Sequence, residues 1–228
     1  MRGLFVTGTD TAAGKTILSA ALLAAMVAAG ERVRAHKPVV TGLHEPSTAW
    51  PPDHELLAAA AGMTPEEVAP LRYGPAVSPH LAAQLAGERV EPPMLLAAAQ
   101  AAAKDTTLIV EGVGGLLVPL AGGYTVRDFA VALESPLLIA ARPGLGTINH
   151  TLLTLEAARA AGLDVRAVVL TPWPEDPSAL ERSNRETIAR MGEVEVDTLA
   201  RVSGPQITEL ARAGAALPWR RWLEQASA

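Results

Sequence analysis

Short runs rich in β-branched residues and leucine alternate along the chain with longer alanine-rich segments. The short runs are apolar at successive positions, which is typical of parallel strands buried on both faces. The longer segments have the length and composition of helices. Strands are predicted over residues 3–7, 32–37, 107–111, 137–141 and 165–170. Helices are predicted over residues 15–29, 54–61, 92–104, 126–133, 148–161 and 178–191.

This alternation predicts an α/β fold, a doubly wound and mainly parallel sheet with helices on both faces. One domain spanning residues 1–228 is expected, because no repeat or linker interrupts the chain. Prolines break the pattern over residues 44–52 and 63–80, which we interpret as loops, the second with one short helix. The pattern weakens after about residue 191. Trp219 and Trp222, at helical spacing, are expected in the core or in a dimer contact.

A glycine-rich segment from Gly8 to Thr16, with the sequence GTDTAAGKT, lies between a predicted strand and a predicted helix. That context predicts a phosphate-binding P-loop, and with it a P-loop NTPase-like sheet. Its backbone N–H groups would wrap a phosphate, and the helix N-terminus would add its positive dipole end. Five residues, not the usual four, separate Gly8 from Gly14. Further nucleotide-binding residues expected here are Ala12, Ala13, Lys15 and Ile17.

Two other predicted strands end in charged residues. Glu111 closes the run 107–111, where P-loop proteins place an acidic residue for Mg²⁺ or its water. Lys37 follows the second strand and would stabilise charge on a transferring phosphoryl group. Gly112, Gly114 and Gly115 follow Glu111, so the backbone there can also approach phosphate, and Gly112, Val113 and Gly114 are expected to bind the nucleotide. Thr16 would supply a hydroxyl to the Mg²⁺ ion.

Asp53 stands at the start of a predicted helix. It would cap that helix, or it would be a second Mg²⁺ carboxylate. The spacing leaves both roles open.

Composition narrows the function classes. The chain is 49% hydrophobic and 19% charged, which excludes a disordered chain. A net charge of −5 argues against a general nucleic-acid binder. The chain has no cysteine, so disulfides, iron–sulfur clusters and cysteine nucleophiles are excluded. The N-terminus lacks a signal-peptide core, and the longest apolar stretch, residues 17–29, is too short for a bilayer. We expect a cytoplasmic protein with no membrane and no nucleic-acid partner.

Taken together, five segments resemble the dethiobiotin synthetase family in order and in loop spacing. The resemblance covers about residues 3 to 170, roughly three quarters of the chain. The segments are GTDTAAGKT from Gly8, Lys37-Pro38-Val39, Ser78-Pro79-His80, EGVGGL from Glu111 and GTINH from Gly146.

The resemblance implies a Mg²⁺-dependent enzyme that joins 7,8-diaminopelargonic acid and CO₂ into the ureido ring of dethiobiotin, with ATP as co-substrate. One amine forms a carbamate, which attacks the γ-phosphate to give a mixed anhydride, and the second amine displaces phosphate. Positioning and charge neutralisation do most of the catalysis in such chemistry. Members of the family work as homodimers with shared active sites.

Residue roles follow from the matched positions. The resemblance implies catalytic roles for Lys15, Lys37 and Thr11, and Mg²⁺ binding by Thr16, Asp53 and Glu111. Thr41 stands at a substrate-contacting position. Gly146, Thr147 and Asn149 begin a helix whose N–H groups would bind the substrate carboxylate of the partner subunit.

The chain also departs from the family. Ala12 replaces an acidic loop residue of many members, and Thr171-Pro172 replaces the Asn-Asp pair that reads adenine. Proline has no N–H, so we predict weak discrimination among nucleotide bases.

Three alternative functions fit the sequence less well. A nucleotide-switch ATPase of the partitioning type carries an extra lysine early in its loop, where this chain has Asp10. A corrinoid-pathway amidating synthetase needs a cysteine in a glutaminase domain. A dinucleotide binder needs Gly-x-Gly-x-x-Gly, which Gly8-Thr9-Asp10 does not supply.

Overall fold

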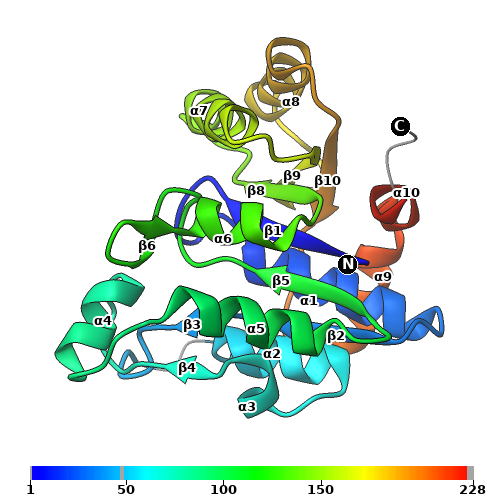
Figure 1. Cartoon of the computed structure of the whole chain (residues 1–228). Helices are drawn as coiled ribbons and strands as arrows, with labels where there is room; N and C mark the ends of the chain where they lie inside the picture. Colours follow the sequence, from blue (N-terminus) through cyan, green and yellow to red (C-terminus); the bar gives the residue numbers. More distant parts are fainter. Residues whose placement is uncertain (1, 47–48, 225–228) are drawn as a thin grey trace.

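A computed structural model describes residues 2–46 and 49–224. Its centre is a six-stranded sheet in the order β10-β9-β8-β1-β5-β2, and all its strand pairs are parallel. The predicted doubly wound α/β fold is confirmed (Figure 1). The strands are β1 (Gly3–Gly8), β2 (Val33–His36), β5 (Thr107–Glu111), β8 (Leu137–Ala141), β9 (Val165–Trp173) and β10 (Val196–Ala200).

Alternate strand residues face two separate cores, one on each side of the sheet. Leu4 and Val6 of β1 point into one core, and Phe5 between them points into the other. All three are fully buried. Period-2 alternation of uniformly apolar residues therefore fills both faces, as a buried parallel sheet requires.

Helices cover both faces of the sheet (Figure 1). The first core is closed by α1 (Lys15–Ala28), α2 (Asp53–Ala61), α3 (Pro65–Val68), α9 (Ile207–Ala215) and α10 (Trp219–Leu223). The second is closed by α4 (Pro79–Leu85), α5 (Pro92–Ala102), α6 (Val126–Leu133), α7 (Thr147–Ala160) and α8 (Ala179–Gly192). None of the helices described is long and apolar enough to cross a membrane.

The proline-rich region holds more structure than the sequence predicts. Residues 63–80 contain α3, the start of α4 and a short strand β4 (Leu71–Arg72), which pairs in parallel with β3 (Val39–Val40). A capping box explains α3: the Thr64 hydroxyl accepts from the Glu67 N–H, and the Glu67 carboxylate accepts from the Thr64 N–H. A further antiparallel pair joins β6 (Pro119–Ala121) to β7 (Tyr124–Thr125).

The segment after residue 192, where the sequence pattern predicts no element, completes the sheet and one core. It supplies β10, α9 and α10, and both Trp219 and Trp222 are 2% exposed within the core. α9 approaches α1 closely, because a Cβ added at Gly214 would lie 2.0 Å from the Ala21 carbonyl oxygen. Only glycine permits that contact, so α9 packs directly against the backbone of α1.

Candidate active site

The loop between β1 and α1 has the form of a phosphate site. Gly14 has a φ of 91°, and Ala12 also lies in the left-handed region with a φ of 57°. The Lys15 ammonium donates to the Asp10 backbone oxygen at 3.0 Å, across the loop. The loop ends at the N-terminus of α1, whose first turn has no acidic residue. Free N–H groups and the helix dipole there favour an anion.

Beside this loop, a buried cluster of charges joins three elements. The Lys37 ammonium lies 2.5 Å from Glu111 Oε1 and 2.9 Å from Asp53 Oδ2. The Thr16 hydroxyl donates to the same Glu111 oxygen at 2.9 Å. Side-chain exposure is 3% for Lys37 and 0% for Glu111, against 47% for Asp53. Four residues predicted from separate segments therefore meet at one point.

Asp53 is the first residue of α2, not its cap. Pro52 holds the N-cap position, and no side chain caps the helix. The capping role considered for Asp53 is therefore wrong. Its carboxylate is directed to Lys37 instead.

The electrostatics of the cluster set the charge states. Burial would lower the pKa of Lys37, but the carboxylates of Asp53 and Glu111 raise it above its ordinary value. Burial would raise the pKa of Asp53, but the Lys37 ammonium holds it below its ordinary value. Burial, then the charge of Lys37, lowers the pKa of Lys15 to about 8. The Lys15 ammonium therefore lacks a full counter-charge, and a bound anion would stabilise it.

The predicted Mg²⁺ ligands offer oxygen donors that suit this ion. Glu111 Oε2 is buried and has no hydrogen-bond partner within the described ranges, so it has a free lone pair beside Thr16. Two carboxylates and a hydroxyl match a hard cation that keeps water and phosphate ligands. Within those same ranges no group of three or more His, Cys, Asp or Glu forms an all-protein metal cage. Bound there, Mg²⁺ would neutralise phosphate charge.

The glycine segment after β5 lies against the phosphate loop. The Gly112 N–H donates to the Val6 oxygen at 2.9 Å, and a Cβ added at Gly115 would lie 3.6 Å from the Gly8 oxygen. A Cβ at Gly114 would lie 3.7 Å from Thr11 Oγ1, which brings Thr11 to this side of the loop. Val113 between them is partly exposed.

The ends of β8, β9 and β10 lie on the other side of the phosphate loop. Thr171 is buried, and a Cβ added at Gly14 would lie 2.4 Å from its Cγ2 atom. The Thr171–Pro172 peptide bond is cis, and Pro172 is exposed. A cavity of about 450 Å³ is lined by Thr9, Arg142, Pro143, Gly144, Leu145, Thr147, His150, Pro172, Glu181 and Arg201. Two arginines directly after β8 and β10 border this cavity, a feature that sequence analysis missed.

Of the residues predicted to bind substrate, Thr147 lines the cavity beside the phosphate loop, and Thr41, Gly146 and Asn149 do not. Thr147 is buried and shares the cavity with Thr9 of the phosphate loop. Gly146 has a φ of 89° and, like Asn149, is exposed. Thr41 is partly buried after β3. Within the described ranges, no backbone hydrogen bond joins these last three residues to the phosphate loop.

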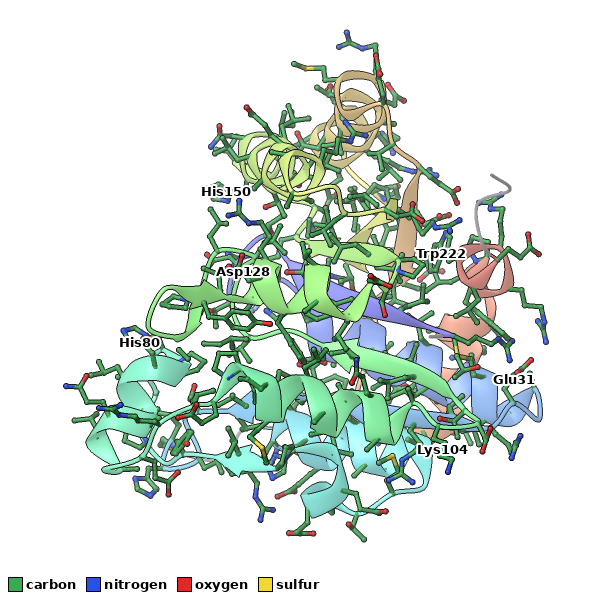
Figure 2. The ribbon with its side chains drawn as sticks, viewed as in Figure 1. Glu31, His80, Lys104, Asp128, His150 and Trp222 are labelled. Carbon is green, nitrogen blue, oxygen red and sulfur yellow. The ribbon has the colours of Figure 1, made fainter. Side chains whose placement is uncertain are left out.

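Two backbone oxygens were also missed. The carbonyl groups of Asp10 and Gly112 accept from Lys15 and from Lys37, the latter at 3.5 Å. Sequence motifs name side chains, so such partners leave no signal. His80 and His150 lie at one end of the molecule, and Lys104 lies at the opposite end (Figure 2).

Sequence comparison assigns the family. A family model described as an AAA domain matches residues 2–212. The ATP-dependent dethiobiotin synthetase BioD of Anaeromyxobacter dehalogenans is 44% identical over 195 residues, covering 84% of this chain and 86% of that protein. The BioD of Bacillus subtilis is 36% identical over 196 residues, covering 84% and 83%. The chain belongs to the dethiobiotin synthetase family. The family resemblance of its motifs is thereby confirmed.

Solved structures agree on the fold of this dethiobiotin synthetase family member. A ParA family ATPase from Chlorobium tepidum has a TM-score of 0.53 at 13% identity, with 94% of this chain and 90% of that chain covered. A structure of apo McdA from Cyanthece has a TM-score of 0.51 at 12% identity, with the same coverage. At such identity the likeness shows a shared P-loop fold alone.

Proposed function

We propose that this chain catalyses the ATP-dependent formation of dethiobiotin from 7,8-diaminopelargonic acid and CO₂. The observation that carries the proposal is the buried Lys37–Glu111–Thr16 cluster beside the phosphate loop. It unites three of the family-matched positions in a chain 44% identical to a protein named as this synthetase. The reaction needs cations at a transferring phosphoryl group and no side-chain nucleophile.

Each lysine has its own task in this proposal. Lys15 contacts the γ-phosphate, because it lies at the start of α1 and lacks a full counter-charge. Lys37 stays cationic between Asp53 and Glu111 and neutralises the carbamate as it attacks phosphorus. Thr11, on the glycine-segment side of the loop, lies near the carbamate.

The phosphates bind the backbone of the loop, with contacts from Ala12, Ala13, Gly14 and Ile17 at the start of α1. Gly112, Val113 and Gly114 approach from the other side. Thr16, Asp53 and Glu111 would hold Mg²⁺, which would supply charge neutralisation when bound. Thr171 and Pro172 lie beside the base, and neither offers the amide that would read adenine.

The substrate carboxylate binds at the N-terminus of α7, at the helix start formed by Gly146, Thr147 and Asn149. Thr41 contacts the diamine from β3. In the proposed homodimer, the start of α7 of one protomer completes the site of its partner. The exposure of Gly146 and Asn149 supports this arrangement.

A nucleotide-switch ATPase is the second candidate, favoured only by the shared fold. Asp10 stands where that class carries a lysine. Its carboxylate accepts from the Thr11 N–H at 2.7 Å, so it braces the loop.

Phosphate release distinguishes the two. The purified protein is assayed with Mg²⁺, bicarbonate and ATP, with and without the diamine, and products are identified by mass spectrometry. Diamine-dependent release with dethiobiotin formation is expected. Phosphate release that does not depend on the diamine would favour the nucleotide-switch ATPase.

Lys37→Met should abolish turnover, whereas Lys104→Met, at the far end of the molecule, should leave it unchanged. Near-normal turnover of a folded Lys37→Met protein would remove Lys37 from the mechanism.

A further inference from the structure

One buried side chain of α8 reaches across to the loop before α7. Asn184 is 4% exposed on a helix that otherwise carries mainly polar and charged residues. Its amide nitrogen Nδ2 donates to the Pro143 oxygen at 2.9 Å and to the Gly144 oxygen at 3.1 Å. Both amide hydrogens are therefore used on consecutive carbonyl groups.

The loop that receives these bonds has little else to hold it. Pro143 has no N–H to donate, and Gly144 has no side chain. The Thr147 N–H reaches back to the Gly144 oxygen at a long 3.3 Å, and no side chain caps α7 at Gly146. Among the described residues, Asn184 supplies the only hydrogen bonds that tie residues 142–146 to an element other than α7 itself.

Packing between α7 and α8 does not depend on Asn184. A Cβ added at Gly192 would lie 2.8 Å from Leu155 Cδ1, so the two helices approach closely near the end of α8. Ile188 and Leu155 belong to the same apolar core. The amide of Asn184 thus acts on the loop, while apolar contacts hold the helices together.

We propose that Asn184 is a positioning residue for the substrate. By fixing the carbonyl groups of residues 143 and 144, it orients the first turn of α7 so that its N–H groups point to the substrate carboxylate. This inference rests on the proposed function, because the carboxylate site at the start of α7 belongs to it. A backbone displacement of about 1 Å at such a site is enough to cost a large factor in reactivity.

The test compares Asn184→Asp and Asn184→Ala with Ser183→Ala, an exposed neighbour on the same helix. Aspartate keeps the size of asparagine but places an acceptor against two carbonyl oxygens. For both Asn184 variants we expect KM for the diamine to rise about tenfold or more, with KM for ATP within about twofold of the wild type. Ser183→Ala should match the wild type in both.

Hydrogen exchange supplies a readout that needs no activity. Amide exchange of residues 144–149 should quicken in the Asn184 variants, while exchange in β8 and in the last turns of α7 stays unchanged. If the wild type makes no dethiobiotin, the proposed function fails, and this exchange pattern still tests the loop contact. An unchanged diamine KM in an active enzyme, a parallel rise of both KM values, or quicker exchange throughout α7 and α8 would each overturn the positioning role. If Asn184→Ala does not fold, the isosteric Asn184→Asp decides.

Discussion

Removing the charge of Lys37 should destabilise the protein well beyond the effect of an ordinary ion pair. Lys37→Met keeps most of the volume and leaves the Glu111 carboxylate, fully buried, without its cation. Breaking one partner of a buried pair costs about 3–5 kcal/mol, because the remaining charge is uncompensated. For a chain of this size that corresponds to a fall in Tm of roughly 6–20 °C.

The measurement is urea unfolding followed by circular dichroism at pH 7, without nucleotide or Mg²⁺ and at one protein concentration. Arg72→Met is the matched control, because Arg72 forms a 2.7 Å ion pair with Glu66 at the surface, with side-chain exposures of 35% and 65%. Its loss should change stability far less than the loss of Lys37, because solvent screens an exposed ion pair. Adding Glu111→Gln to Lys37→Met should restore much of the stability, since the amide is neutral and still accepts from Thr16. A Lys37→Met protein within about 1 kcal/mol of the wild type, or a double variant no more stable than the single one, would refute the reasoning.

Three further predictions concern a glycine of the phosphate loop, the pH dependence of stability and the preference for a nucleotide base. Gly14→Ala should weaken nucleotide binding, measured by calorimetry, at least about tenfold, because a Cβ would meet Thr171 at a φ of 91°; Gly30→Ala, with a φ of 81° and open space, should not. Burial lowers the pKa of His36 from 6.5 to about 4. Between these two pH values the unfolded chain therefore binds more protons at His36 than the folded chain does. Stability should therefore fall by about 3 kcal/mol as pH drops from 6.5 to 4, and urea titrations of His36→Gln should lack that slope. ATP should be preferred over CTP and GTP by less than about a hundredfold in kcat/KM, and a larger preference would show that another group reads the base.

The sequence predicted the sheet and the two-sided helical cover, because uniformly apolar runs leave few alternatives to buried parallel strands. It did not predict β10, whose residues include Asp197 and Thr198 between apolar neighbours. Such a run, at the edge of the sheet, lacks the apolar signature that marks the inner strands. The short strands β3 and β4 fall among prolines, where local signals favour loops.

For the site, sequence motifs named the residues but not their pairing. Lys37 follows β2 and Glu111 ends β5, and the two chain segments are neighbours because β5 lies between β1 and β2 in the sheet. Strand order is a property of the whole fold, so no local pattern contains it. The same holds for Asp53, whose ion pair with Lys37 no local pattern contains, and for Asn184, whose partners lie 40 and 41 residues away.

The close approach of α9 to α1 affects the order in which this protein is completed during synthesis. The helix that carries Lys15 and Thr16 is made early, yet the surface around Ala21 receives its cover only when residues 207–215 have emerged. Until then a run of alanine and leucine on α1 stays open to water, to chaperones and to other nascent chains. The helix that follows the predicted phosphate loop is thus among the last parts to be covered, so a chain interrupted late in synthesis would have this loop but lack the packing that supports it.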